Sequence, residues 1–339
     1  MTPTPEQRVS SLHASSIVFD GHCDTLLSIR DGERRLAERR ESQPQGDITH
    51  SLHIDLPRLR EGGVTAQIFA CFVRARYLPA DATNEALRLI DAFYRSVEEN
   101  TDSLLLATTA SDVERAQVEG KVAGVLSLEG AEGLEGDLAV LRLFHRLGLR
   151  ALGLTWNWRN QAADGLGEIR TGGGLTEFGV ALVKEANRLG IMLDIAHLAP
   201  AGVRDVLALS ESPVVASHAN ARALCAHPRN LTDEQLEGVA ASGGLVAVTY
   251  VPNFLSQDGR QASLEKVLDH IDYIVGRIGV AHVGLGSDFD GFGGVLPGLE
   301  DVSRLPHLTA GLVARGYSDE HVSRILGGNY LRVFRQVCG

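Results

Sequence analysis

Short apolar runs recur along the chain, separated by longer segments in which apolar residues are spaced as in amphipathic helices. Eight of these runs are predicted to be β-strands: 17–20, 64–70, 122–128, 151–155, 191–195, 213–217, 245–249 and 282–286. The runs are continuously apolar, which is typical of strands that are buried on both faces of a parallel sheet. The pattern therefore predicts parallel strands that alternate with helices.

The segments between the runs carry helix signals. Helices are predicted over 84–97, 178–189, 201–209 and 264–278. Asp55 is expected to begin a short helix that ends at Gly62, and Thr232 with Gln235 forms a capping box that opens another helix. Eight strands with covering helices indicate a (β/α)8 TIM-type barrel. The alternative is an open doubly wound sheet, which is disfavoured because no Gly-x-Gly-x-x-Gly turn follows the first strand.

Length and composition fit one domain of this kind. The 339 residues are predicted to form a single barrel domain, 1–339, with 1–15 as a short helical lead-in and 30–50 as an exposed loop of solvated charges. Hydrophobic residues make up 44% of the chain, which suits a sizeable core. No linker rich in Pro, Gly or Ser marks a second domain.

Charge and cysteine content narrow the classes of function. The formal net charge of -11 argues against a nucleic-acid partner, because such a partner needs a basic face. No run approaches the ~18 apolar residues of a membrane span, and the N-terminus lacks the regions of a signal peptide. The four cysteines are widely scattered, which fits a reducing compartment. We therefore expect a cytoplasmic protein without a membrane partner.

Residues that bind metals recur where the predicted strands end. They are His22 and Asp24 after the first strand, Glu129 after the third, His197 after the fifth, His218 after the sixth and Asp288 after the eighth. A lone histidine at such a place is more often a surface or capping residue than a ligand. In a parallel barrel, however, all strands end at one face, so these six side chains are expected to converge there. The sequence thus predicts a metal site.

The predicted ligands are too many for one catalytic zinc ion, which takes three protein ligands and one water. They suit two ions that share a carboxylate: His22 and Asp24 on one ion, His197 and His218 on the other, and Glu129 on both. Two ions about 3.5–4 Å apart lower the pKa of a water between them, so that a bridging hydroxide can attack. Asp288 is expected to act as general base and then to protonate the leaving amine. The alternative for Asp288 is a sixth ligand or a hydrogen-bond anchor for a histidine.

Several of these motifs also carry a family resemblance. The motifs are His22-x-Asp24, Ser127-Leu128-Glu129-Gly130, Asp194-Ile195-Ala196-His197, Ser217-His218 and the stretch from Gly286 to Gly291. Together, and in this order, they resemble the renal (membrane) dipeptidase family, zinc dipeptidases among the amidohydrolase-type barrels. The resemblance extends from about residue 16 to residue 335.

The resemblance implies residue roles. It makes Glu129 the bridging ligand, Asp288 the proton shuttle and Arg229 the group that binds the C-terminal carboxylate of the substrate. A guanidinium forks onto a carboxylate through two hydrogen bonds, although a loop arginine judged by residue type alone is more often a surface charge.

The chain departs from the family pattern after the fourth strand. Where the animal enzymes have a histidine that helps to hold the scissile carbonyl, this chain has Trp156, followed by Asn157. Trp156 has one indole N–H to donate and cannot accept a proton. Either that N–H or Asn157 takes the place of the histidine, or the second ion polarises the carbonyl alone. The substitution bears on substrate identity more than on the type of reaction.

The function expected from these residues is that of a binuclear zinc dipeptidase with two Zn²⁺ as cofactors. Its substrate would be a small dipeptide, and the family extends this to dipeptides with a D-configured C-terminal residue. An alternative is another metal-dependent amidohydrolase, such as an N-acyl amino acid or lactone hydrolase. A non-catalytic metal-binding barrel is a third reading, which an unligated Asp288 beside the water disfavours. A homodimer is compatible with the sequence.

Overall fold

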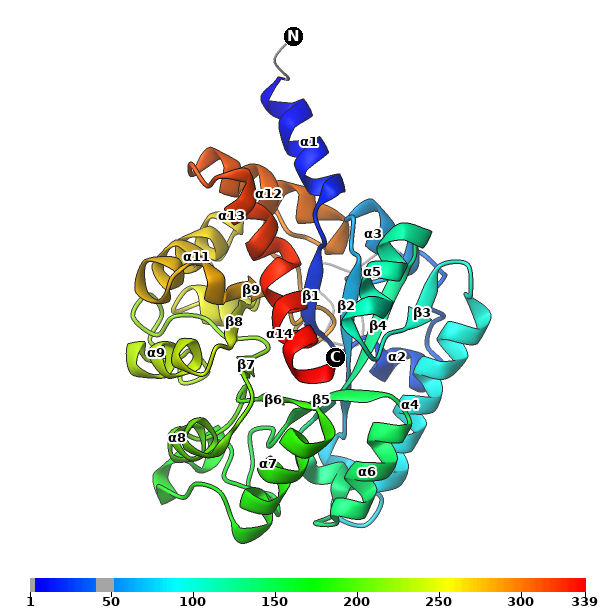
Figure 1. Cartoon of the computed structure of the whole chain (residues 1–339), viewed down its shortest axis with the longest axis vertical. Helices are drawn as coiled ribbons and strands as arrows, with labels where there is room; N and C mark the ends of the chain where they lie inside the picture. The colour runs from blue at the N-terminus through cyan, green and yellow to red at the C-terminus, as the bar shows by residue number, and fades with distance from the viewer. Residues whose placement is uncertain (1–3, 41–51) are drawn as a thin grey trace.

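A closed parallel barrel lies at the centre of the computed structural model, which describes residues 4–40 and 52–339 (Figure 1). Its strands are β1 Phe19–Cys23, β2 Ala66–Phe72, β3 Leu104–Leu106, β4 Val122–Glu129, β5 Leu149–Gly153, β6 Met192–Asp194, β7 Val214–Ala216, β8 Leu245–Val248 and β9 Val283–Leu285. The sheet order is β2-β1-β9-β8-β7-β6-β5-β4-β3, and an additional β2–β4 pairing closes the ring. All of these pairings are parallel, which confirms the predicted (β/α)8 barrel.

Eight strands were predicted, and the additional strand in the structure is β3. It spans three residues and pairs with the first residues of β4, so that Leu104 lies opposite Val122. So short a run gives no periodic signal, and its strand conformation depends on pairing with β4. The prediction also misses the helix that follows, Ala110–Glu119.

The strand bounds differ from the predicted ones at the first strand. It runs over Phe19–Cys23 instead of 17–20, so His22 lies within the strand and Asp24 directly follows it. Glu129 is the last residue of β4. These ligand candidates therefore stand on or beside the rigid barrel wall.

Helices surround the barrel and follow its strands in turn (Figure 1). Their bounds are α1 Pro5–Ser15, α2 Leu26–Arg30, α3 Leu56–Glu61, α4 Ala82–Glu99, α5 Ala110–Glu119, α6 Leu138–Arg146, α7 Glu177–Leu189, α8 Pro200–Leu209, α9 Asp233–Ala241, α10 Pro252–Leu255, α11 Leu264–Ile278, α12 Leu305–Ala314, α13 Asp319–Ser323 and α14 Asn329–Cys338. The predicted capping box at Thr232 and Gln235 opens α9, and the Asp55 side chain caps α3. The lead-in folds as α1 and packs against α12.

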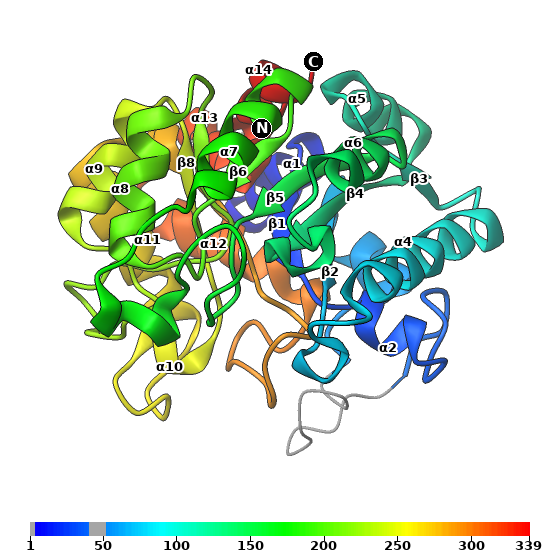
Figure 2. The same ribbon diagram turned by 90° about the horizontal axis from the view of Figure 1, so that it is seen from below.

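Helix α14 covers the end of the barrel at which the strands begin. On Phe19 of β1, the rings of Tyr330 and Phe334 pack at centroid distances of 4.5 and 6.0 Å. Gly21 makes room for this contact, because a Cβ at that position would lie 2.5 Å from the Tyr330 ring. Figure 2 shows α14 at the top and the segments that follow the strands, such as α2 and α10, at the opposite end. An active site is therefore expected at the opposite end, where the strands end.

The predicted exposed loop at 30–50 is in part wrong. Arg34 is only 5% exposed, and its guanidinium lies 2.5 Å from the carboxylate of Asp290. Its other nitrogens donate to the Ser28 hydroxyl and to the Ile54 carbonyl, each at 2.7 Å. Residues 41–50 of the predicted loop lie outside the described residues. Arg34 thus links the segment after β1 to the loop after β9 through buried polar contacts.

Candidate active site

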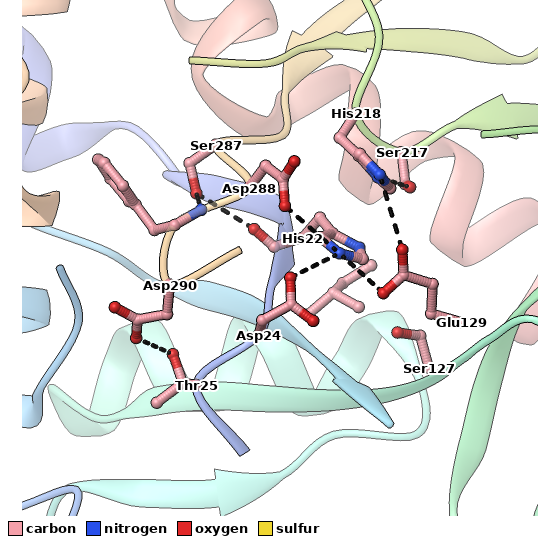
Figure 3. A network of polar contacts seen from close by, with 12 residues as sticks. His22, Asp24, Thr25, Ser127, Glu129, Ser217, His218, Ser287, Asp288 and Asp290 are labelled. Atoms are coloured by element: carbon pink, nitrogen blue, oxygen red, sulfur yellow. Dashed lines mark hydrogen bonds and ion pairs between the residues drawn. The ribbon is translucent and has the colours of Figure 1, made fainter. Parts of the chain in front are cut away.

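The other four predicted ligands converge around Glu129 at the rim, and Figure 3 shows Glu129 with three of them, His22, Asp24 and His218. On one side, Glu129 Oε2 lies 3.5 Å from His22 Nε2, which in turn lies 3.5 Å from Asp24 Oδ2. On the other side, Glu129 Oε1 lies 3.1 Å from His197 Nε2 and 3.9 Å from His218 Nε2. The two imidazole nitrogens are 3.0 Å apart. The two oxygens of one carboxylate therefore face two separate sets of ligand atoms.

This arrangement fits bound metal ions. Two ligand atoms on one tetrahedral ion, each bonded at about 2.0–2.1 Å, lie about 3.3 Å apart. The distances between the ligand atoms here, 3.0 to 3.9 Å, bracket that value. His22 Nε2 is buried and has no hydrogen-bond partner among the described residues. A buried nitrogen without a partner is costly, and an ion would satisfy it.

The ionisation of the cluster differs between its two sides. Burial works to lower the pKa of His22, but Glu129 and Asp24 together raise that pKa well above its ordinary value. Burial also opposes the charge of Glu129, yet His22 and His197 hold the Glu129 pKa well below its ordinary range. Without a cation, a proton on His22 thus balances the carboxylates.

The other two histidines are neutral. Burial, together with the positive charge of Arg229, lowers the pKa of His197 to about 4. Burial, followed by the charge of His22, lowers the pKa of His218 well below its ordinary value. Neutral imidazole is the form that binds a metal ion, so this side needs to lose no proton when it does so.

Asp288 follows β9 and completes the rim. Its Oδ1 lies 3.9 Å from His22 Nε2. Burial, with the negative charges of Asp24 and Glu129, raises the pKa of Asp288 well above its ordinary value, against the opposing charge of His22. A carboxyl group with a raised pKa can take up a proton and return it near neutral pH.

Asp288 and His197 share an uncommon backbone conformation. Their φ angles are 62° and 67°, in the left-handed region that side chains other than glycine seldom adopt. The His22 carbonyl accepts a hydrogen bond from Asp288 N at 3.2 Å, and the His197 carbonyl accepts one from Leu166 N at 2.9 Å. Surrounding structure thus holds both residues in place, as is common at functional sites.

A cavity of about 370 Å³ opens beside the cluster. Its lining includes Leu27, Phe72, Val251 and Phe254, together with Trp156, Asn157, His227 and Arg229. The four apolar residues were not predicted, although Phe72 ends β2 at the same rim. His227 also lines the cavity and accepts a hydrogen bond from Arg229 N at 3.2 Å through Nδ1.

Arg229 presents a buried positive charge to this cavity. It is 6% exposed, and it forms no ion pair with any residue that the structure describes. One Nη donates to the His218 carbonyl at 3.2 Å, the guanidinium lies 5.4 Å from the centre of the Phe254 ring, and Nε has no partner among the described residues. A buried guanidinium in this state is suited to a carboxylate ligand.

Asn157 contacts a predicted metal ligand. Its Oδ1 lies 2.8 Å from His197 Nδ1. Because an amide oxygen only accepts hydrogen bonds, Nδ1 carries the hydrogen and Nε2 stays free for an ion. Trp156 lies with its ring 5.9 Å from that of His197 and 5.1 Å from that of Phe72. Both predicted substrate residues therefore border the cavity, and Asn157 also orients His197.

Comparison with known proteins decides the family. The model of the membrane dipeptidase family (peptidase family M19) matches residues 6–338. The chain belongs to the membrane dipeptidase family. A dipeptidase of Claviceps purpurea (strain 20.1), tcpJ, is 35% identical over 327 residues, which cover 94% of this chain and 76% of the relative.

Solved structures of M19 proteins have the same fold. A dipeptidase described as a metallopeptidase of family M19 superposes with a TM-score of 0.87 and 36% identity, covering 96% of this chain and 99% of that chain. A metallopeptidase from Rhodobacter sphaeroides, liganded with a phosphinate mimic of the dipeptide L-Ala-D-Ala, gives a TM-score of 0.85 and 35% identity, covering 95% and 100%.

The chain is accordingly an M19 metallo-dipeptidase that uses a metal cofactor and acts on dipeptides. Two groups of ligand atoms in the described residues are close enough to hold an ion: His22, Glu129 and His218, and His22, Asp24 and Asp288. None of the described helices is both long and apolar enough to cross a membrane.

Proposed function

We propose that this M19 dipeptidase holds two Zn²⁺ ions, which Glu129 bridges. The observation that carries the proposal is the position of the Glu129 carboxylate, whose two oxygens face different ligand sets. His22 and Asp24 lie near Oε2, and His197 and His218 lie near Oε1. When bound, such a pair of ions supplies Lewis acidity and lowers the pKa of a water between them. Imidazole and carboxylate ligands suit zinc.

Arg229 is proposed to bind the free C-terminal carboxylate of the dipeptide. Its buried guanidinium lines the same cavity as Glu129 and Asp288. A carboxylate would supply the charge partner that Arg229 lacks among the described residues, and two parallel hydrogen bonds would fix its direction. This anchoring places the peptide bond one residue away from the carboxylate, which would limit the substrate to two residues.

Asp288 is proposed to move the proton. It would accept one from the attacking water and return it to the leaving amine, a role that supports typical accelerations of 10²–10⁴-fold. Its raised pKa supports the return step, because a carboxyl group that holds its proton near neutral pH can donate it. Trp156 through its indole N–H, and Asn157 through its amide N–H₂, are proposed to border the substrate carbonyl.

The proposal extends to dipeptides with a D-configured C-terminal residue. In its support, the Rhodobacter sphaeroides relative is described in complex with a mimic of L-Ala-D-Ala. A cytoplasmic location, a single domain over 1–339 and a homodimer also stay predictions.

A substrate panel tests this function. The zinc-loaded protein is given L,L- and L,D-dipeptides, the same dipeptides as C-terminal amides, N-acyl amino acids and lactones, each with and without a chelator. We expect turnover of free dipeptides that the chelator abolishes, and KM values for the amides at least 10-fold higher, because a lost charged hydrogen bond costs about 1.5–3 kcal/mol. Equal turnover of amides and free dipeptides would contradict the role of Arg229. Preference for N-acyl amino acids or lactones would favour the alternative amidohydrolase.

A further inference from the structure

Two contacts of the same form each join an aspartate on one strand to the serine that follows the neighbouring strand. Asp194, the last residue of β6, lies with Oδ2 2.5 Å from Ser217 Oγ, just beyond β7. Asp20 of β1 lies with Oδ2 2.6 Å from Ser287 Oγ, just beyond β9. In each pair the serine N–H also donates to the other carboxylate oxygen, at 2.9 and 2.7 Å. Each serine directly precedes a residue of the proposed site, His218 or Asp288.

The two contacts differ in the second partner of the serine. Ser217 Oγ lies 2.7 Å from His218 Nδ1 (Figure 3). Among the described residues, Ser287 Oγ has no imidazole nitrogen as its partner, and it contacts instead the His22 carbonyl at 3.1 Å. The first contact therefore reaches the ring of a proposed ligand, whereas the second reaches only backbone.

With Asp194 ionised, the form that its three hydrogen-bond donors favour, a count of hydrogens gives the direction of the first chain of contacts. Asp194 Oδ1 accepts from the N–H groups of Ala196 and Ser217, each at 2.9 Å, so three donors converge on this carboxylate. A hydroxyl has one hydrogen, and Ser217 gives it to Asp194. Ser217 Oγ can then only accept from His218, so Nδ1 carries the ring hydrogen. His218 Nε2 is left with its lone pair, and it is this atom that faces Glu129 Oε1 and His197 Nε2.

We propose that Asp194, acting through the Ser217 hydroxyl, fixes His218 in the tautomer that carries hydrogen on Nδ1 and thereby makes Nε2 available to a metal ion. Ser217 contacts the proposed ligand His218, and Asp194 acts on that ligand through Ser217, so both are positioning residues. A neighbour that fixes the tautomer of a ligating histidine typically changes metal affinity by 10–100-fold. The inference rests on the proposed role of His218 as a ligand, and it is independent of the substrate.

The first test observes the tautomer itself. In the metal-free full-length protein, long-range ¹H–¹⁵N correlation spectra distinguish the two neutral forms of each histidine ring. We expect His218 to carry its hydrogen on Nδ1, and Ser217→Ala to produce a mixture of both forms. His218 with its hydrogen on Nε2 in the unaltered protein would mean that Asp194 donates instead of accepting, and would overturn the proposal.

The second test measures zinc affinity by competition with a chromogenic chelator. We expect Ser217→Ala to weaken the binding of one of the two ions by about 10–100-fold, and Ser217→Thr, which keeps the hydroxyl, to restore it. Ser287→Ala is the matched variant, since it removes the serine of the second contact, and it should leave both zinc affinities unchanged. An unchanged affinity in Ser217→Ala, or an equal loss in Ser287→Ala, would overturn the proposal.

Two features of the design keep the outcome interpretable. Ser217→Ala retains the N–H that bonds to Asp194, so it disturbs the fold less than replacing the buried aspartate. Ser242→Ala removes a hydroxyl that accepts from Val214 N at 3.1 Å, at the other end of β7, and controls for general loosening of that strand. Neither test measures dipeptide turnover. If the protein does not turn over free dipeptides but His218 shows the expected tautomer, the proposed function is contradicted and the proposed role of Asp194 and Ser217 is not.

Discussion

The two sides of Glu129 hold different ligand sets in different protonation states. On the β1 side, His22 lies among Asp24, Glu129 and Asp288, and its raised pKa keeps a proton in place of a cation. On the β6–β7 side, His197 and His218 are neutral, and Asn157 and Ser217 contact their Nδ1 atoms. The first side holds a proton that a bound ion would displace, whereas the second is already in the neutral form that binds an ion. The following predictions test this difference.

Removing the group common to both sides should have the largest effect. We expect Glu129→Gln to lose tight binding of both ions and, with it, several kcal/mol of transition-state stabilisation, or roughly 10⁴-fold in kcat/KM. Metal content after gel filtration and dipeptide turnover measure the two effects. Glu135→Gln, at an exposed position beyond the same strand, is the control. A Glu129→Gln protein that keeps two tightly bound ions would refute the bridge.

Asp288 belongs to the β1 side, yet it is proposed to move protons instead of completing the metal site. We expect Asp288→Asn to lower kcat by about 10²–10⁴-fold while the protein keeps its metal content, since it removes a general base. Steady-state kinetics and metal analysis of the same sample measure both quantities. Loss of an ion together with activity would make Asp288 a ligand, and full activity would exclude it as the base.

Arg229 adjoins the β6–β7 side through the His218 carbonyl. We expect Arg229→Ala to raise KM for free dipeptides by roughly 10²-fold, because a buried ion pair that loses one partner typically costs about 3–5 kcal/mol, of which a solvated substrate recovers part. KM for C-terminal amides should change little. Arg229→Lys keeps the positive charge but loses the two parallel hydrogen bonds of the guanidinium. Its KM for free dipeptides should lie between that of the unaltered protein and that of Arg229→Ala. Equal increases for amides and free dipeptides would remove Arg229 from carboxylate binding.

In the metal-free protein, the two sides should respond to pH in opposite directions. The pKa of His197 in the folded protein is lowered to about 4, so below about pH 6.5 the unfolded chain takes up a proton at this residue before the folded chain does. The free energy of unfolding that neutral His197 contributes is therefore lost as pH falls from 6.5 toward 4. Its full size is at most roughly 3 kcal/mol. The raised pKa of His22 stabilises the fold below pH 6.5, and that contribution is lost as pH rises through the raised value.

Chemical denaturation across pH 4–9 measures this contrast. His197→Gln should reduce the loss of stability on the acid side, and His22→Gln the loss on the alkaline side. If both variants changed the stability on the same side of the pH range, the assigned protonation states would be contradicted.

The sequence was sufficient to predict the barrel and the convergence of His197, His218, Glu129 and Asp288, because parallel strands end at one rim whatever their spacing along the chain. Other features depend on contacts that no local pattern reveals. Arg34 looks like a solvated charge until Asp290, 256 positions away, is seen to bind it. The three residues of β3 become a strand only beside β4. The Ser217 hydroxyl is meaningful only once its distances to Asp194 and His218 are known.

The most direct test of a bridged pair of ions is the number of zinc ions held by the purified, fully loaded protein, measured by elemental analysis against protein concentration after removal of loosely bound metal. The account predicts two ions per chain in the unaltered protein, and one in variants that remove a ligand from only one side, His22→Asn or His218→Asn. No more than one tightly held ion in the unaltered protein would contradict it.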